Sequence, residues 1–364
     1  MSTDYHMIKY IHESPDALQR TLDSNESAIQ SLAVHAVESG IRRVIIVGMG
    51  SSYTAAVMAA PVFYYHAALP VYIMPASELP HYAPRLVDRR TLVVSVSRSG
   101  ERGQAIDALK DAVGRGALSV AMTGVSDSLL AQTSQLALIT SEGPEITFPK
   151  TKSVITSAGL LMRLALALAA PEDSEAAARL YALRSTPHLI RRTIEATEEA
   201  VRRMIPALQI FHTVRVAGSG SNYGTALEGA MKIQEAASIV AHATDLGNLL
   251  HDPLGVANEG WLIIPLISLE DQETGQTALE LAGKFGARRL AVAAPGLDAG
   301  GAAEYVITLP ETLDPLLNGL IYLPPLQLLA YYWAVARGLN PDAPASMHTT
   351  LSAVLAPGRK EPEL

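Results

Sequence analysis

Three ionisable residues fall on one face of a helix that the sequence predicts over 226–237. Glu228, Lys232 and Glu235 follow an i, i+4, i+7 spacing. A lysine between two acids can keep a carboxylate ionised and ready to act as a base, although a solvated row of salt bridges gives the same spacing. His251, in a loop with Gly and Pro around it, is a second candidate for proton transfer near neutral pH, while a lone histidine is more often structural.

Two Gly- and Ser-rich segments, 48–52 and 95–100, follow predicted strands and precede predicted helices. Glycine lets the backbone approach a ligand, hydroxyl groups donate hydrogen bonds, and helix N-termini add N–H groups, which together suit a phosphate monoester. One such loop alone could be an ordinary turn, but two in one half favour a site. The residues expected to bind the phosphate are Gly50, Ser51, Ser52, Ser97, Arg98, Ser99 and Arg102.

These loops need an α/β scaffold to bring them together. Apolar, β-branched runs predict strands that alternate with helices, which indicates a parallel sheet covered by helices on both faces. The predicted strands of the first half lie at 43–48, 71–74, 91–96, 118–123 and 136–140. Residues 6–38 have helical spacing, with Pro15 expected near a helix start, and 158–170 reads as a buried helix.

The same pattern restarts in the second half. Gly48 pairs with Gly218 and Gly50 with Gly220, at an offset of 170 residues. Further strands are predicted at 261–265, 289–293 and 305–308. We therefore expect two tandem doubly wound α/β domains, flavodoxin-like three-layer sandwiches, over 1–185 and 186–364, joined within the polar helical stretch around 171–203.

Composition excludes several classes of protein. The 364 residues carry a net charge of −8 and include no cysteine, which excludes disulfide scaffolds, thiolate metal sites and cysteine nucleophiles. Scattered arginines in an acidic chain argue against nucleic-acid binding. The N-terminal residues do not read as a signal peptide, and the apolar runs are short for a membrane span. We expect a cytoplasmic protein without metal or cofactor.

Several segments resemble one known family, the double SIS (sugar isomerase) domain proteins, and in particular the isomerase half of glucosamine-6-phosphate synthase without its glutaminase domain. The segments that carry the resemblance are Gly50-Ser-Ser-Tyr, Ser97-Arg-Ser-Gly-Glu, Glu145-Ile-Thr-Phe-Pro-Lys-Thr-Lys, Ala226-Leu-Glu-Gly-Ala-Met-Lys-Ile-Gln-Glu, Leu323-Pro-Pro-Leu-Gln-Leu-Leu-Ala-Tyr-Tyr and Asn340-Pro-Asp-Ala-Pro. Together with the N-terminal segment His6-Met-Ile-Lys-Tyr-Ile-His-Glu-Ser-Pro-Asp-Ala-Leu, they span nearly the whole chain.

The resemblance implies roles for the candidate residues. Glu235 would move a proton between carbons 1 and 2 of a hexose or amino sugar 6-phosphate, supported by Glu228 and Lys232. His251 would open the sugar ring and would come from the neighbouring subunit, which implies a homodimer. The phosphate would lie against Ser52, Ser97, Arg98 and Arg102.

Departures from the family shape the expected activity. Arg98 and Arg102 stand where the family has Gln and Thr, and Phe148-Pro-Lys150 stands where it has Val-Ala-Ser. Thr349, beside His348, occupies the position of the synthase lysine that forms an imine. These differences favour an aldose–ketose isomerase, an amino sugar phosphate deaminase or a deglycase over a glutamine-dependent amidotransferase. A non-catalytic regulatory protein that only binds a sugar phosphate is the alternative.

Overall fold

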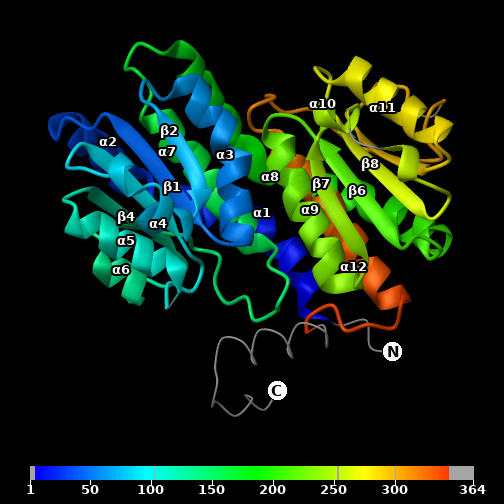
Figure 1. Ribbon diagram of the computed structural model, residues 1–364, viewed down its shortest axis with the longest axis horizontal. Helices are drawn as coiled ribbons and strands as arrows, with labels where there is room; N and C mark the ends of the chain where they lie inside the picture. The colour runs from blue at the N-terminus through cyan, green and yellow to red at the C-terminus, as the bar shows by residue number, and fades with distance from the viewer. Residues whose placement is uncertain (1–4, 102, 252–253, 300, 344–364) are drawn as a thin grey trace.

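Two parallel five-stranded sheets with helices packed on them form the architecture (Figure 1). The computed structural model describes residues 5–101, 103–251, 254–299 and 301–343. The predicted α/β class with two tandem doubly wound domains is confirmed. Arg102, His348 and Thr349 lie outside the described residues.

The first sheet has the strand order β2-β1-β3-β4-β5, with every pairing parallel. Its strands are β1 Arg43–Gly48, β2 Val71–Pro75, β3 Thr91–Val96, β4 Leu118–Thr123 and β5 Leu136–Ile139. Alternate residues of β1 serve the two faces: Val44 and Ile46 pack into one core cluster, and Ile45 and Val47 into another. A continuous apolar run is therefore what this strand requires.

The second sheet has the order β10-β9-β8-β6-β7, again parallel throughout, so its topology matches that of the first. Its strands are β6 Thr213–Gly218, β7 Val240–Asp245, β8 Trp261–Ile267, β9 Arg288–Ala293 and β10 Tyr305–Thr308. Strand β7 is not predicted from the sequence pattern. This edge strand interleaves His242, Thr244 and Asp245 with alanine, so it lacks the apolar run of a central strand.

Helices surround both sheets. Their bounds are α1 His6–Ser24, α2 Glu26–Glu38, α3 Ser51–His66, α4 Glu78–Tyr82, α5 Gln104–Gly114, α6 Leu129–Thr133, α7 Lys152–Ala167, α8 Ser174–Leu208, α9 Ser221–Ala237, α10 Leu246–Leu249, α11 Gln272–Lys284 and α12 Gly319–Ala336, with short 3₁₀ turns at Pro84–Leu86 and Leu254–Val256. The placement of Pro15 near a helix start is wrong, because this buried residue lies inside α1. The buried helix expected over 158–170 is α7.

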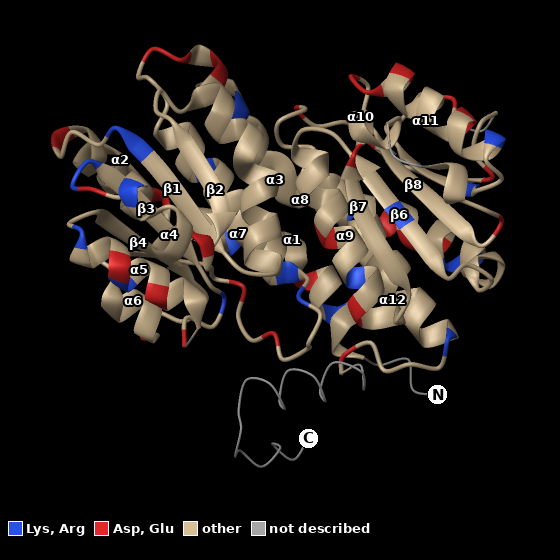
Figure 2. Cartoon of the chain, viewed as in Figure 1, with Lys and Arg blue, Asp and Glu red and all other residues tan. Residues whose placement is uncertain are grey.

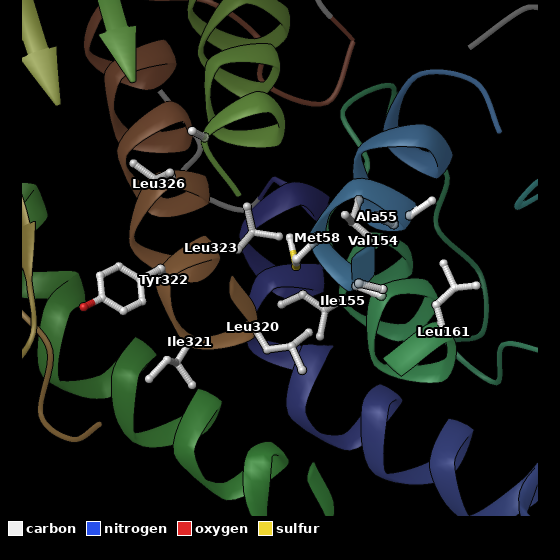
Figure 3. Close-up of a cluster of buried hydrophobic side chains, with 14 of the residues drawn as sticks. Ala55, Met58, Val154, Ile155, Leu161, Leu320, Ile321, Tyr322, Leu323 and Leu326 are labelled. Carbon is white, nitrogen blue, oxygen red and sulfur yellow. The ribbon is translucent and has the colours of Figure 1, made fainter. Parts of the chain in front are cut away.

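The two halves meet along helices α3, α7, α9 and α12. Figure 3 shows side chains of α3, α7 and α12 gathered in one buried cluster. Gly224 of α9 allows this helix to pack closely on α3, because a Cβ atom there would lie 2.3 Å from the backbone N of Met58. The helix that carries the acid–lysine row is thus packed directly on the helix that follows the first glycine-rich loop.

The long helix α8 links the halves, and the predicted boundary between residues 185 and 186 falls within it. Lysine and arginine are interspersed with acidic residues over both halves (Figure 2). Within the described ranges, none of the helices is both long and apolar enough to cross a membrane.

Candidate functional site

The two glycine-rich loops have nearly the same backbone. Gly50 precedes α3 with φ 53° and ψ −129°, and Gly220 precedes α9 with φ 55° and ψ −128°. Positive φ favours glycine, which explains why both halves keep it at this point. Each loop thereby turns sharply from a strand into the N-terminus of a long helix.

The acid–lysine row lies on one face of α9, as the spacing predicts. The Nζ atom of Lys232 is 3.1 Å from Oε1 of Glu228 and forms a second ion pair with Glu235. The side chains of Glu228 and Lys232 are fully buried, whereas that of Glu235 is 13% exposed. The row is therefore not a solvated surface feature, and Glu235 is the member that faces open space.

Helix α3 of the first half completes this row. The hydroxyl of Ser51 donates to Oε1 of Glu228 at 3.1 Å and accepts from Nζ of Lys232 at 3.3 Å. The hydroxyl of Thr54 donates to the other carboxylate oxygen of Glu228. Glu228 is therefore held by groups from both halves, and its hydrogen bonds fix where Lys232 and Glu235 stand.

Burial and neighbouring charges have opposite effects on the pKa values of Lys232 and Glu235. Burial raises the pKa of Glu235 above its usual value, although the Lys232 ammonium opposes that rise. Burial disfavours the charged form of Lys232, but the carboxylates of Glu228 and Glu235 together raise its pKa. Lys232 is thus held as an ammonium ion, and Glu235 is a stronger base than an exposed glutamate.

Glu235 opens onto a small cavity of about 210 Å³ with polar and apolar lining residues. Gly50, Ser51 and Ser52 of the first loop and Arg98 of the second line it together with Glu235. Loops from one half and the acid from the other therefore share one space, in which a phosphate and a proton-transfer group would be close together. Such a cavity fits a small phosphorylated ligand.

Arg98 is positioned by a buried acid that the sequence analysis did not single out. Its Nε atom is 3.6 Å from Oε1 of Glu142, whose side chain is 1% exposed. Burial raises the pKa of Glu142, and the nearby Arg98 guanidinium opposes this. The pair keeps the guanidinium at the cavity wall.

Other predicted residues lie apart from this cavity. The hydroxyl of Ser97 accepts a hydrogen bond from the N–H of Gly100 at 3.3 Å, so it stabilises its own loop, and Ser99 is exposed. His251 is exposed after α10 and does not line the cavity. The roles expected for Ser97, Ser99 and His251 stay predictions.

The cavity also has members that the sequence analysis left out of the site. Lys150 lies in the loop before α7, and Ser153 and Ser157 lie on the first turns of α7. The signal was present, because Lys150 belongs to a segment quoted for the family resemblance. No spacing rule links this segment to α9 without the fold.

A wider groove of about 610 Å³ lies near Tyr53 and Tyr223. Its lining is mainly apolar and aromatic, with Asp245 as its one charged lining residue among those described. Proton-transfer chemistry therefore fits the smaller cavity better. Within the described ranges, no group of His, Cys, Asp and Glu residues is arranged to hold a metal ion.

Comparison with known proteins agrees with this architecture. The SIS domain model matches residues 39–169 and 211–337. Glutamine–fructose-6-phosphate aminotransferase from Pyrobaculum aerophilum is 31% identical over 349 residues, which cover 95% of this chain and 57% of that protein. The chain therefore spans a little over half the length of this curated relative.

Solved structures share the fold at lower identity. The C-terminal domain of glucosamine-fructose-6-phosphate aminotransferase from Francisella tularensis gives a TM-score of 0.84 at 23% identity and covers 94% of this chain and 100% of that one. Glucosamine-6-phosphate deaminase from Thermotoga maritima gives 0.74 at 21% identity and covers 93% and 97%. The fold and the site define a class of proteins in which two α/β domains, each with a parallel sheet, share one cavity. The chain belongs to the SIS domain family.

Proposed function

We propose that this chain is a phosphosugar enzyme that moves a proton between carbons 1 and 2 of an open-chain sugar 6-phosphate. The observation that carries the proposal is Glu235, a buried base that shares one small cavity with Ser52 and Arg98. The first unit, 1–185, would bind the sugar phosphate, and the second unit, 186–364, would supply the proton-transfer groups. Arg102 would add a further charge to the phosphate site.

Deamination, deglycation and isomerisation all share this proton transfer. In the first two reactions the substrate's own amine can supply the imine, so the lysine whose family position is Thr349 in this sequence is unnecessary. We therefore place the activity among these three rather than with glutamine-dependent amidotransfer. The cationic cavity, with Arg98 and Lys150 at its wall, agrees with an acidic phosphorylated substrate.

Deuterium exchange tests the proposal directly. Fructose 6-phosphate incubated with the protein in deuterium oxide should take up deuterium at carbon 1, and Glu235→Gln should abolish the uptake while the sugar phosphate still binds. Binding without exchange by the unaltered protein would contradict the enzyme and favour the regulatory alternative. A panel of amino sugar phosphates and sugar–amino acid phosphates, followed by ammonia and amino acid release, identifies the reaction.

His251 is proposed to reach the cavity of a partner subunit in a homodimer. Mixing Glu235→Gln protein with His251→Ala protein tests this, because each mixed dimer would hold one intact site. Random re-association of equal amounts should restore about a quarter of the unaltered activity. If both variants are inactive alone and stay inactive after proven subunit exchange, His251 does not act in the cavity of the partner subunit.

A further inference from the structure

Glu142 is a buried acid that the proton transfer does not use. It lies in the segment between β5 and α7, its side chain is 1% exposed, and its Oε1 atom is 3.6 Å from Nε of Arg98. Arg98 lines the cavity, whereas Glu142 is not among the lining residues. The acid therefore contacts the guanidinium from behind the cavity wall, where it cannot touch a ligand itself.

The contact between these two side chains is close but incomplete. A distance of 3.6 Å is longer than a good hydrogen bond. Among the described residues, neither carboxylate oxygen of Glu142 has a partner at hydrogen-bond distance and angle, and neither has Nε of Arg98. Nη2 of Arg98 donates to the backbone carbonyl of Gly143, but at 3.5 Å. Because a buried carboxylate is normally well supplied with donors, the charged form of Glu142 is weakly supported.

The groups around Glu142 favour and oppose its ionisation at the same time. Burial raises the pKa of Glu142, and the carboxylate of Glu145 in the same segment raises it further. The hydroxyl of Thr140 and the guanidinium of Arg98 oppose this rise. On the side of α1, the exposed Arg20 donates to the backbone carbonyl of the residue before Glu142 at 3.2 Å. Any group that draws the charge of Arg98 away from Glu142 therefore favours protonation of the acid.

We propose that Glu142 is a positioning residue, which holds Arg98 by charge in the empty site and takes up a proton when a sugar phosphate binds to Arg98. The inference rests on the proposed function, since it needs the phosphate in this cavity. A phosphate dianion becomes the new counter-ion of the guanidinium and repels a second anion buried behind it. The proton comes from the solvent and forms an O–H bond on the carboxylate, so no other reagent is needed.

Proton uptake makes the affinity depend on pH. The pKa of Glu142 is then higher in the complex than in the free protein, so the phosphate binds best at low pH and more weakly as the pH rises toward the pKa of the complex. In that window the dissociation constant should rise by up to about tenfold per pH unit. The window can reach neutral pH, because buried glutamates with pKa values of about 8–9 are known.

The charge role and a purely structural role predict opposite effects of Glu142→Gln. Glutamine has nearly the same shape but no charge, so it leaves Arg98 without a buried counter-ion. The variant should bind the phosphate more tightly than the unaltered protein at the upper end of the window, and its affinity should change less with pH. If Glu142 only holds Arg98 in place, the variant should bind more weakly at every pH.

Calorimetry with glucitol 6-phosphate tests the proposal, because this probe has the phosphate but no carbonyl group and is not turned over. Titrations of the full chain from about pH 7 to about pH 9, where the ester is already a dianion, in two buffers of different ionisation enthalpy give the number of protons taken up. Glu235 and Lys150 also line the cavity and titrate. The difference between the unaltered protein and Glu142→Gln, rather than the total uptake, therefore assigns the proton. We expect a difference of up to about one proton.

The matched control is Glu280→Gln on the exposed surface of α11, which should keep the affinity and the proton uptake of the unaltered protein. Equal uptake by Glu142→Gln and the unaltered protein, or weaker binding by Glu142→Gln at every pH, would overturn the proposal. If Glu142→Gln does not fold, Arg98→Ala decides. Without the guanidinium the buried acid keeps its proton in both states, so the uptake should fall even though the binding is weaker, and an unchanged uptake would overturn the proposal.

The outcomes also separate this inference from the proposed function. Deuterium exchange together with the same pH dependence in Glu142→Gln and the unaltered protein leaves the enzyme standing and overturns the role of Glu142. A proton uptake that Glu142→Gln removes, in a protein that shows no exchange, supports the role of Glu142 and contradicts the enzyme. A chain that binds neither glucitol 6-phosphate nor fructose 6-phosphate overturns both.

Discussion

Lys232→Met removes the cation that holds the acid–lysine row together. The side chains of Lys232 and Glu228 are fully buried, and Nζ of Lys232 is 3.1 Å from Oε1 of Glu228. Glu235 forms an ion pair with the same ammonium group. Methionine retains most of the length of the side chain and its apolar contacts but no charge. The substitution leaves two carboxylates on neighbouring turns of α9 with no cation between them.

The expected cost follows from this geometry. Opposite charges 3.1 Å apart attract by about 5 kcal/mol at an effective dielectric constant of about 20. Part of the loss is recovered, because the pKa of Glu235, already raised by burial, rises further and the group takes up a proton. We therefore expect the free energy of unfolding to fall by about 3–5 kcal/mol, the usual cost of breaking a buried ion pair.

Urea unfolding at neutral pH, followed by circular dichroism and by tryptophan fluorescence, measures this cost. Lys110→Met is the matched control, because Lys110 is exposed on α5. The same substitution there should change the free energy of unfolding by no more than about 0.5 kcal/mol. Agreement between the two probes tells whether both halves unfold in one transition.

A small effect would refute the reasoning. If Lys232→Met lies within about 1 kcal/mol of Lys110→Met, the row contributes little and its groups are better solvated than their burial indicates. A second variant sharpens the test. Adding Glu228→Gln to Lys232→Met removes one of the two facing carboxylates, so the pair of changes should destabilise by less than the sum of the single changes.

Three further predictions concern the cavity and the packing around it. Arg98→Ala should weaken fructose 6-phosphate binding by about 1.5–3 kcal/mol in calorimetry, the range for a hydrogen bond to a charged group, and unchanged affinity would mean that the guanidinium does not contact the phosphate. Because Glu235 must be ionised to act and burial raises its pKa, kcat should fall as pH drops through a value above that of an exposed glutamate; an acid limb at the ordinary value would contradict the burial of the base. Gly224→Ala should lower the free energy of unfolding by about 1–3 kcal/mol, since its Cβ would meet the backbone N of Met58, whereas Gly114→Ala on α5, with open space around it, should not destabilise.

Local patterns were enough to predict the scaffold. The central strands are buried on both faces and therefore appear in the sequence as continuous apolar runs. The i, i+4, i+7 spacing placed Glu228, Lys232 and Glu235 correctly on one face of α9. Edge strand β7 was missed because half-exposed strands carry polar residues, and Pro15 was misplaced because tertiary packing tolerates it inside α1.

The assembly of the cavity could not be predicted in the same way. Lys150 and Glu142 come from the segment between β5 and α7, which has no regular spacing, and only the fold brings them beside Arg98 and Glu235. The direction of each pKa shift depends on burial, which no local pattern reports. The hydrogen bond from Ser51 to the row could not be predicted either, since its partner Glu228 is 177 residues away in the sequence.

The hydrogen bonds from Ser51 and Thr54 to Glu228 also bear on how this chain can change over evolutionary time. Two hydroxyl groups of the first half donate hydrogen bonds to a carboxylate of the second half. A substitution at these positions in one half therefore has to be matched by a compatible residue in the other. Replacing the first half by that of a relative would leave Glu228 short of donors unless the new half brought hydroxyl residues at the same places. Although the halves share one topology, they are no longer interchangeable modules: they must co-evolve across the surface where they meet.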